Sequence, residues 1–514
     1  MRMSPRRLLP RLADDRGFTM IIAIMVMFVT SLLLVAAFTA ANGEVHNSQI
    51  NVEQKQAYYA ALAGVQEYEY QLQFNPNYWQ TCPEPKGAVP GEETESYAVT
   101  TLSAKTNPEA SKKCNAANPF STIIESSGTL ANTFRIKSVG KSGKESRSVV
   151  ASFQVAGFLD YVYYTQYEVQ DPETYGGNSE CAAYKEEREA KGLKCVQIYF
   201  GENDDVKGPM HTNDAVYYCN GVEFGRPGHE PADAVEINRG ANYGNCGSGS
   251  VTYNTSTGKP SVGPDIEAPP NDTSLSFYVE RPQNYFEGRT KFKLEGSVNK
   301  IKVTKAGGAE ETIEWPKNGL IYVANSASGC GYSNFEQEGT DTNNTYEKEL
   351  GCGSAYVEGT YSKSLTIAAA VDLTITGSIT PTGVTAGNAP TGTAAMGLIA
   401  TRFVRMYHPC TSATGNTTGP VGSTPMSPWI YAAILSTSHS FLVDNYECGK
   451  SLGNLNIYGA IGQKFRGIVG KLSGEGYIKN YLYDERLATG EPPYFLAPLK
   501  AGWRIIRETA PVAG

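Results

Sequence analysis

The chain opens with a long apolar stretch followed directly by a stretch with helical periodicity. From Phe18 to Ala41 no side chain is charged, and 24 helical residues at 1.5 Å each extend about 36 Å, enough to cross a bilayer core. The segment "EVHNSQINVEQKQAYYAALAGVQEYEYQLQF" follows, with Gly64 as the helix breaker before Pro76 and with apolar residues at three- and four-residue steps. The pattern predicts one helix over residues 18–74, apolar on all sides in its first half and amphipathic in its second.

Alternating apolar and polar residues then replace the helical period. Residues 75–156 contain the runs "ESYAVTTL", "STIIESSG", "NTFRIKSVGKSG" and "SRSVVASFQVAG", separated by turn residues. Such runs are typical of antiparallel strands with one face covered. We expect a small antiparallel sheet that packs against the amphipathic half of the helix.

The remaining residues, 157–514, form many short apolar runs joined by polar, glycine-rich loops. Examples are "CVQIYFG", "GLIYVAN", "SLTIAAAVDLTITGSIT" and "WIYAAILST", and helical patterns are almost absent. The runs between Leu365 and Ile379 and between Gly397 and Tyr483 favour a right-handed β-solenoid over a sandwich, although no clean repeat is visible. The predicted fold class is therefore α+β and predominantly β, with a long N-terminal helix, a small antiparallel sheet and a large β-rich head.

Composition changes this picture in two ways. The 44 basic and 52 acidic residues give a net charge of -8, which argues against nucleic acid as the main partner. The cysteines are even in number, without CxxC or metal-ligand spacing, so disulfides explain them better than buried free thiols. Pairing neighbours in order is our preferred connectivity, because local loops close most easily. The ten candidates are Cys82, Cys114, Cys181, Cys195, Cys219, Cys246, Cys330, Cys352, Cys410 and Cys448.

The residues before the apolar stretch are basic. Arg2, Arg6, Arg7, Arg11 and Arg16 place the N-terminus on the cytoplasmic side and the bulk of the chain outside. A cleaved secretory signal is an alternative, because "AAFTAAN" offers small residues for a cleavage site. The uninterrupted continuation of the helix speaks against it.

The segment "RGFTMIIAIMVMFVTSLLLVAAF" resembles the N-terminus of type IV prepilins and type II secretion pseudopilins, and "QAYYAALAGVQEYEYQLQ" is similar to the helix of large minor pilins. The resemblance implies a leader over residues 1–17, cleavage between Gly17 and Phe18 by a prepilin peptidase, and methylation of the new amine. It also implies a single-pass membrane protein before assembly, which then packs with other pilin subunits in an extracellular filament. Major pilins carry glutamate at the fifth mature position, whereas this chain carries Ile22 there. Tip pseudopilins also lack that glutamate, so the resemblance is closer to them.

Candidate chemistry elsewhere is sparse. His211 lies beside Asn213 and Asp214, where a structural turn is the stronger interpretation. Glu202, Asp204 and Asp205 offer oxygen ligands for calcium, with a solvated loop as the preferred alternative. Carboxylates for a carbohydrate-cleaving site are offered by Asp372, Asp444, Asp484 and Glu485, with ordinary surface charge as the preferred alternative. A sugar- or protein-binding surface is offered by Tyr161, Tyr163, Tyr164, Tyr167 and Tyr199, with core packing as the alternative.

The sequence therefore favours a structural protein over an enzyme, with no cofactor and no metal. The leading hypothesis is a large minor pilin at a filament tip or priming position, whose head meets a surface, a glycan or a protein partner. The alternatives are a membrane-tethered solenoid that cleaves polysaccharide and a plain anchored surface protein.

Overall fold

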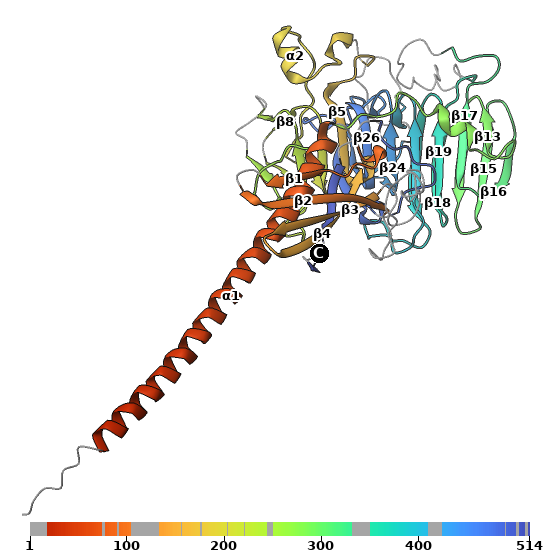
Figure 1. Cartoon of the computed structure of the whole chain (residues 1–514). Coiled ribbons are helices and arrows are strands. Elements are labelled where there is room, and N and C mark those ends of the chain that lie inside the picture. The colour runs from red at the N-terminus through yellow and green to blue at the C-terminus, as the bar shows by residue number, and fades with distance from the viewer. Residues whose placement is uncertain are drawn as a thin grey trace, which may run out of the picture.

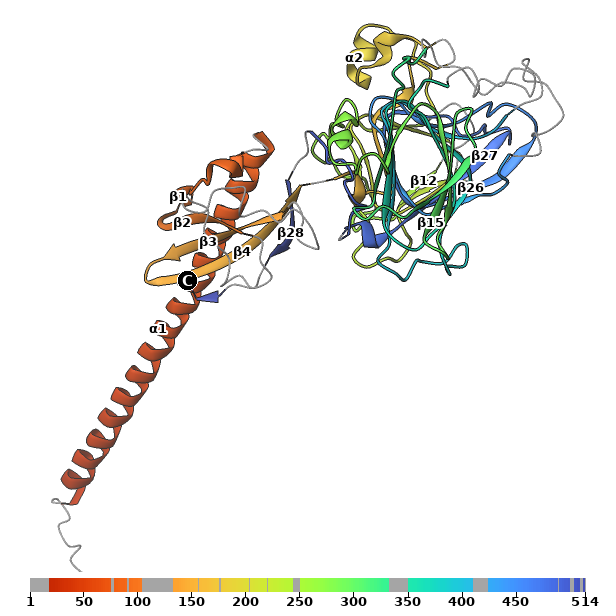
Figure 2. The same ribbon diagram turned by 90° about the vertical axis from the view of Figure 1, so that its right-hand side faces the viewer.

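A long helix, a small sheet and a large β-rich head make up the chain (Figures 1 and 2). The structure is a computed structural model and describes residues 18–74, 78–89, 92–103, 133–155, 157–174, 177–202, 204–219, 221–243, 250–331, 350–409, 424–488, 490–499, 503–508 and 512–513. The helix leads from one end of the molecule into the small sheet, and the head lies beside that sheet at the other end. This arrangement confirms the predicted fold class.

Helix α1 runs unbroken from Phe18 to Phe74. Gly64, the helix breaker noted in the sequence, faces the sheet, and a methyl group there would lie 2.3 Å from Ser138 Oγ. A methyl group on Gly140 of the sheet would likewise lie 2.1 Å from the carbonyl oxygen of Ala57. Glycine at both positions therefore permits the helix and sheet backbones to approach closely.

The small sheet is antiparallel and lies against the second half of α1. Its first strands are β1 (Lys86–Val89), β2 (Glu92–Ser103), β3 (Thr133–Ser142) and β4 (Glu145–Val155). Val65, Tyr68 and Leu72 of the helix are buried against Phe134 and Phe153 of the sheet. Three of the four predicted runs lie in β2, β3 and β4, whereas "STIIESSG" falls outside the described residues.

The end of the chain also belongs to this small sheet. Strands β28 (Trp503–Glu508) and β29 (Val512–Ala513) both pair antiparallel with β4. The sequence predicts these residues as part of the head, because a short run such as "WRIIRE" carries no information about which strand it pairs with. The head is therefore an insertion between two parts of the small sheet, and the chain leaves and re-enters that sheet at β4.

Two parallel strand ladders form the head, as in a β-solenoid. The first ladder consists, in spatial order, of β13 (Tyr285–Glu287), β17 (Leu320–Ala324), β19 (Leu365–Ala369), β21 (Met396–Ala400), β24 (Ala433–Ser436), β26 (Ser451–Arg466), β5 (Tyr163–Gln170), β7 (Met210–Thr212) and β10 (Val235–Ile237).

The second ladder also contains β26, which is long enough to take part in both. Its members are β14 (Thr290–Glu295), β18 (Ala355–Tyr361), β20 (Leu373–Pro381), β22 (Val404–Met406) with β23 (Trp429–Ile430), β25 (Phe441–Val443) with β26, β27 (Gly476–Tyr483), β6 (Asp205–Lys207), β9 (Val222–Phe224) and β12 (Val251–Tyr253). Strands β15 (Lys300–Lys305) and β16 (Glu310–Glu314) extend it antiparallel beyond β14, and β8 (Val216–Tyr218) pairs with β11 (Ala241–Tyr243).

The order in which the chain builds these ladders is unusual. It enters in the middle at β5 and winds outward to β12, and residues 264–284 then connect to β13 at the opposite end. From β13 it winds back until β26 pairs with β5 and β27 pairs with β6. Figure 1 shows the blue β26 beside the much earlier β5. We call the contact of β26 and β27 with β5 and β6 the seam.

Apolar side chains fill both the inside of the solenoid and one outer face. Phe224, Ile367 and Ile375 are among the residues buried between the two ladders. On the outside of the first ladder, Ile266 and Phe495 belong to segments that pack over its strands. Strands such as β19 are thus buried on both faces, which explains their continuous apolar sequence.

Candidate functional site

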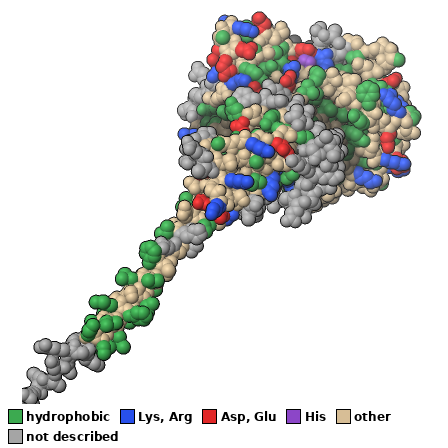
Figure 3. Space-filling view, in the orientation of Figure 1, with side chains coloured by type: hydrophobic (Ala, Val, Ile, Leu, Met, Phe, Trp, Pro, Cys, Tyr) green, Lys and Arg blue, Asp and Glu red, His purple; other side chains and the backbone are tan. Residues whose placement is uncertain are grey.

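The first half of α1 is the most exposed apolar surface that the structure describes. Ile22, Met27 and Phe38 are 46%, 69% and 69% exposed, and no residue from Met20 to Ala41 is charged or buried. Within the described ranges this is the one helix that is long and apolar enough to span a membrane. Figure 3 shows its hydrophobic surface below the charged side chains near the sheet. Gly17 lies outside the described residues, and Phe18 is the first residue of α1.

His211, the best catalytic candidate from the sequence, is fully buried in β7. Its Nδ1 lies 2.7 Å from Glu236 Oε2, and its Nε2 lies 2.8 Å from Asn213 Oδ1. The Asn213 side chain in turn donates to the carbonyl of Ile266 over 2.6 Å and accepts from the Ile266 amide over 3.0 Å. The histidine therefore helps to hold the 264–284 connection against the solenoid, in agreement with the structural interpretation.

Arginines pair with all four carboxylates that were weighed as a carbohydrate-cleaving site. Asp372 and Asp444 do meet, but on Arg405 between them, at 3.0 Å and 2.6 Å. These two carboxylates are 3% and 0% exposed. The other two are also paired, Asp484 with Arg486 and Glu485 with Arg226, each at 2.6 Å. The arrangement explains why these charges are tolerated near apolar strands.

The three oxygen ligands that were weighed for calcium do not converge. Asp204 pairs with Lys479 at 2.6 Å and Asp205 pairs with Lys207 at 2.8 Å, while Glu202 is exposed. Among the described residues there is no group of three or more histidine, cysteine or acidic side chains placed to hold a metal ion.

The tyrosine-rich segment divides into a buried and a partly exposed group. Tyr161, Tyr163 and Tyr164 are buried, and burial raises the pKa of Tyr163 and Tyr164 well above the usual value. Tyr163 donates to Glu168 over 2.9 Å and Tyr164 to the Ile266 carbonyl over 2.6 Å. These three are core residues, whereas Tyr167 and Tyr199 are only partly buried.

Tyr199 lines a cavity of about 510 Å³ beside the seam. Residues 196–202 and Asp204 form one wall, and the turn that follows β26, residues 468–474, forms the other. Leu472 at the tip of that turn lies directly over Gly201, where a methyl group would come within 2.4 Å of its Cδ2 atom. Tyr446 and Tyr477 complete the aromatic lining.

Two buried ion pairs cross the seam behind this cavity. Arg466 of β26 donates to Glu168 of β5 over 2.9 Å, and Lys479 of β27 donates to Asp204 over 2.6 Å. The Phe200 ring lies against both cations, 3.5 Å from the Arg466 guanidinium carbon and 5.6 Å from Lys479 Nζ. Burial lowers the pKa of Lys479, opposed by the attraction of Asp204.

The same arginine also fixes a wall of the cavity, because Arg466 Nη1 donates to the Ile198 carbonyl over 2.9 Å. These two ion pairs are not among the residues predicted from the sequence. A signal was available, because "GQKFR" and "YIKNYLY" place cations inside apolar strands, where a buried charge requires a partner.

Disulfides support the loops around the head. Cys181 is bonded to Cys195, and Cys330 to Cys352, each the next cysteine along the chain, as in-order pairing predicts. Cys82, Cys219 and Cys448 are disulfide-bonded too. Cys114, Cys246 and Cys410 fall outside the described residues, so the remaining connectivity stays a prediction.

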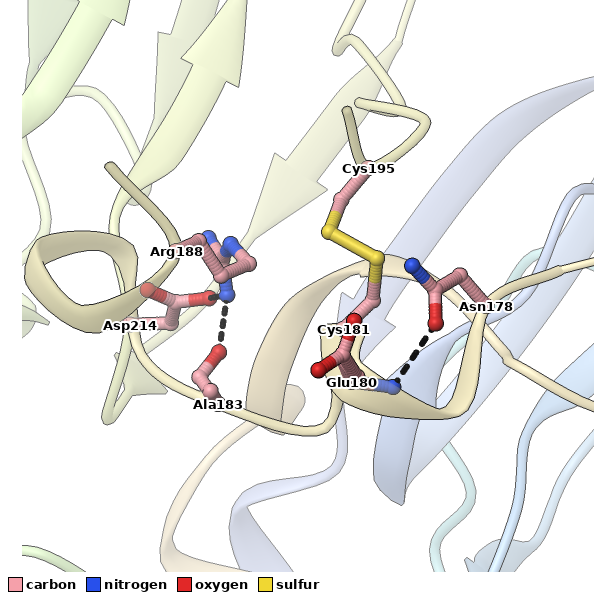
Figure 4. The surroundings of a disulfide bond; sticks show 7 residues. All are labelled: Asn178, Glu180, Cys181, Ala183, Arg188, Cys195 and Asp214. Carbon is pink, nitrogen blue, oxygen red and sulfur yellow. Dashed lines mark hydrogen bonds and ion pairs between the residues drawn. A yellow bond between two sulfur atoms is a disulfide. The ribbon is translucent and has the colours of Figure 1, made fainter. Parts of the chain in front are cut away.

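Figure 4 shows the Cys181–Cys195 bridge beside helix α2 (Lys185–Ala190). Asp214 accepts from the backbone of Lys185 over 3.0 Å and from Arg188 over 2.7 Å, which anchors this helix to the solenoid. Cys195 directly precedes the cavity wall that starts at Val196. The bridge therefore restrains the end of that wall.

Comparison with known proteins gives little further information. No family model and no curated protein matches the chain. Among solved structures the chain is similar to the competence-associated pilin ComZ from Thermus thermophilus, at 11% sequence identity and a TM-score of 0.27. The match covers 90% of this chain and 98% of that chain. A similarity at this level supports no conclusion about fold or function.

Proposed function

We propose that the chain is a structural subunit of a type IV pilus-like filament. The observation that carries the proposal is the two-part helix α1, which is exposed and apolar over residues 20–41 and packed on the small sheet further on. Such a helix sits in lipid before assembly and against the apolar helices of other subunits afterwards. The exposed half is then an assembly surface, and the head is presented outside the cell.

Processing follows from the junction before the helix. A prepilin peptidase cleaves between Gly17 and Phe18 and methylates the amine of Phe18. Glycine suits the position, because the absence of a side chain permits close approach to the backbone. Removal of the arginine-rich leader leaves a helix that no longer carries a cytoplasmic charge anchor.

The apolar residue Ile22 supports a minor position for the subunit. A subunit without a carboxylate at this site offers no partner to the terminal amine of a neighbouring subunit, and an unpaired ammonium among apolar helices is costly. We therefore place the chain at the tip of the filament or in its priming complex, with the head free to bind a surface or a partner.

The mature N-terminus tests this function. Mass spectrometry of the protein from its native membrane should show a chain that starts at methylated Phe18. A Gly17→Leu variant should keep its leader, whereas Gly43→Ala, a glycine substitution within the helix, should be processed normally. An unprocessed wild-type chain would support a plain anchored protein, and a chain that starts near Asn42 would support a cleaved signal.

A further inference from the structure

We propose that the cavity between residues 196–202 and the turn 468–474 is a binding site for a short neutral oligosaccharide. The cavity measures about 510 Å³, within the range of small-molecule sites in proteins. The proposal rests on the proposed function only for its setting, an exposed head, because sugar binding does not require assembly.

The charges around the cavity argue against an acidic ligand. Lys479 is held by Asp204 at 2.6 Å, and Lys471 by Glu447 at 3.2 Å. Each of these two cations is therefore balanced by a carboxylate, whereas recognition of phosphate, sulfate or uronate favours an excess of positive charge. Glu202 is exposed and has no partner among the described residues. The available charge at the site is thus negative.

The lining offers both apolar and polar groups, and a sugar ring presents both apolar C–H faces and hydroxyls. Tyr199, Ile198 and Leu472 offer flat or aliphatic surface for the C–H faces of a ring. Gln197 and Glu202, together with the backbone of Gly470 and Gly474, supply polar groups for hydroxyls. Tyr446 and Tyr477 have their hydroxyls engaged with Glu447 and with the Pro425 carbonyl, so they contribute ring surface.

The walls of the cavity are held firmly, which lowers the ordering cost of binding. Arg466 holds the Ile198 carbonyl, and the Gln170 amide donates to the Val196 carbonyl over 3.0 Å. Asp204 accepts from the amides of Gly201 and Lys479 over 2.9 Å and 3.2 Å, which links the first wall to strand β27. The cavity is therefore shaped before a ligand arrives.

Calorimetric titration of the full chain in detergent tests the proposal with four probes: cellotriose, N-acetylated chitotriose, trigalacturonate and trilysine. We expect millimolar or tighter binding of at least one neutral trisaccharide and none of trigalacturonate. Tyr199→Ala and Leu472→Asp should each weaken that binding about five- to tenfold, since each removes one apolar contact surface. The matched control Tyr278→Ala removes a tyrosine that is 59% exposed and does not line the cavity, and it should have no effect.

Glu202→Lys gives a test that does not depend on a loss of binding. The added cation should admit trigalacturonate, which the wild-type chain does not bind. Binding of trilysine alone, binding of no probe, or sugar binding that is unchanged in both Tyr199→Ala and Leu472→Asp would overturn the proposal. None of these outcomes affects the filament function, which is decided by the mature N-terminus.

Discussion

Arg466 donates to Glu168 over 2.9 Å although 298 residues separate them in the chain. The two side chains are 1% and 0% exposed, and they join β26, the last strand of the first ladder along the chain, to β5, the first one. The pair therefore lies where two separately wound parts of the solenoid meet. Parallel strands pair through evenly spaced backbone bonds, so a buried ion pair at this contact favours one register over its neighbours.

Breaking this pair should destabilise the head strongly. Arg466→Met leaves Glu168 buried without its cation, and we expect a loss of about 3–5 kcal/mol in the free energy of unfolding. The double variant Arg466→Met/Glu168→Gln should recover most of that loss, because no uncompensated charge remains. Urea unfolding monitored by tyrosine fluorescence measures both.

The matched control for this experiment is Lys207→Met. Lys207 pairs with Asp205 at 2.8 Å, but the two side chains are 42% and 43% exposed. Its removal should cost no more than about 1 kcal/mol. Equal losses in Lys207→Met and Arg466→Met would contradict the role assigned to the seam.

The helix and the small sheet were predictable because their signals are local. Tyr68 and Leu72 follow the helical period, and the alternation in "NTFRIKSVGKSG" marks a strand with one covered face. The short apolar runs likewise predicted a stacked β head. These features depend on neighbours along the chain, which the sequence displays directly.

The seam and the cavity depend on partners far apart in the chain. Nothing near Tyr163 indicates that it lies opposite Ile461, because strand alternation sets which face is buried but not which strand is adjacent. The same holds for β28, whose pairing with β4 moves the end of the chain into the small sheet. For the same reason Asp372 and Asp444 looked scattered, although Arg405 brings them together.

Asp272 should make the stability of the 264–284 connection depend on pH. It is fully buried, accepts from Tyr322 over 3.1 Å and from Thr401 over 3.0 Å, and burial raises its pKa to about 7. The folded state therefore binds this proton more tightly than the unfolded state. Stability should fall as the pH rises from about 4 to 7 and should then level off, with a total effect of up to ~4 kcal/mol.

An Asp272→Asn variant should lack this contribution and be more stable than the wild type above pH 7. Hydrogen exchange of residues 264–284 at pH 5 and pH 8 measures the local effect. The control Asp205→Asn removes a carboxylate that is 43% exposed and should leave the wild-type pH dependence in place. An Asp272→Asn variant with the pH dependence of the wild type would show that another group is responsible.

Two glycines should respond oppositely to alanine. In Gly140→Ala the new methyl group meets backbone atoms of α1, 2.1 Å from the Ala57 oxygen and 2.3 Å from the Ala61 nitrogen, so helix and sheet must separate. We expect a loss of about 1–3 kcal/mol, as for other overpacked contacts. Gly43→Ala has nothing within 4 Å and should stabilise the helix by about 1 kcal/mol. Thermal unfolding followed by far-ultraviolet circular dichroism distinguishes the two, and a Gly140→Ala variant as stable as the wild type would contradict the close packing.

Ile22→Glu should move the subunit from the end of the filament into its length. The variant supplies a carboxylate that can pair with the terminal amine of a neighbouring subunit, which Ile22 cannot do. Immunogold labelling of an epitope on the head should then show label along the filament in place of label at one end.

Ile24→Glu is the matched control, because Ile24 is also exposed, at 57%, but a carboxylate there lies on another side of the helix. It should reduce assembly without redistributing the label, since an unpaired charge among apolar helices is costly. An Ile22→Glu subunit that assembles and keeps the wild-type position would show that this residue does not decide where the subunit sits.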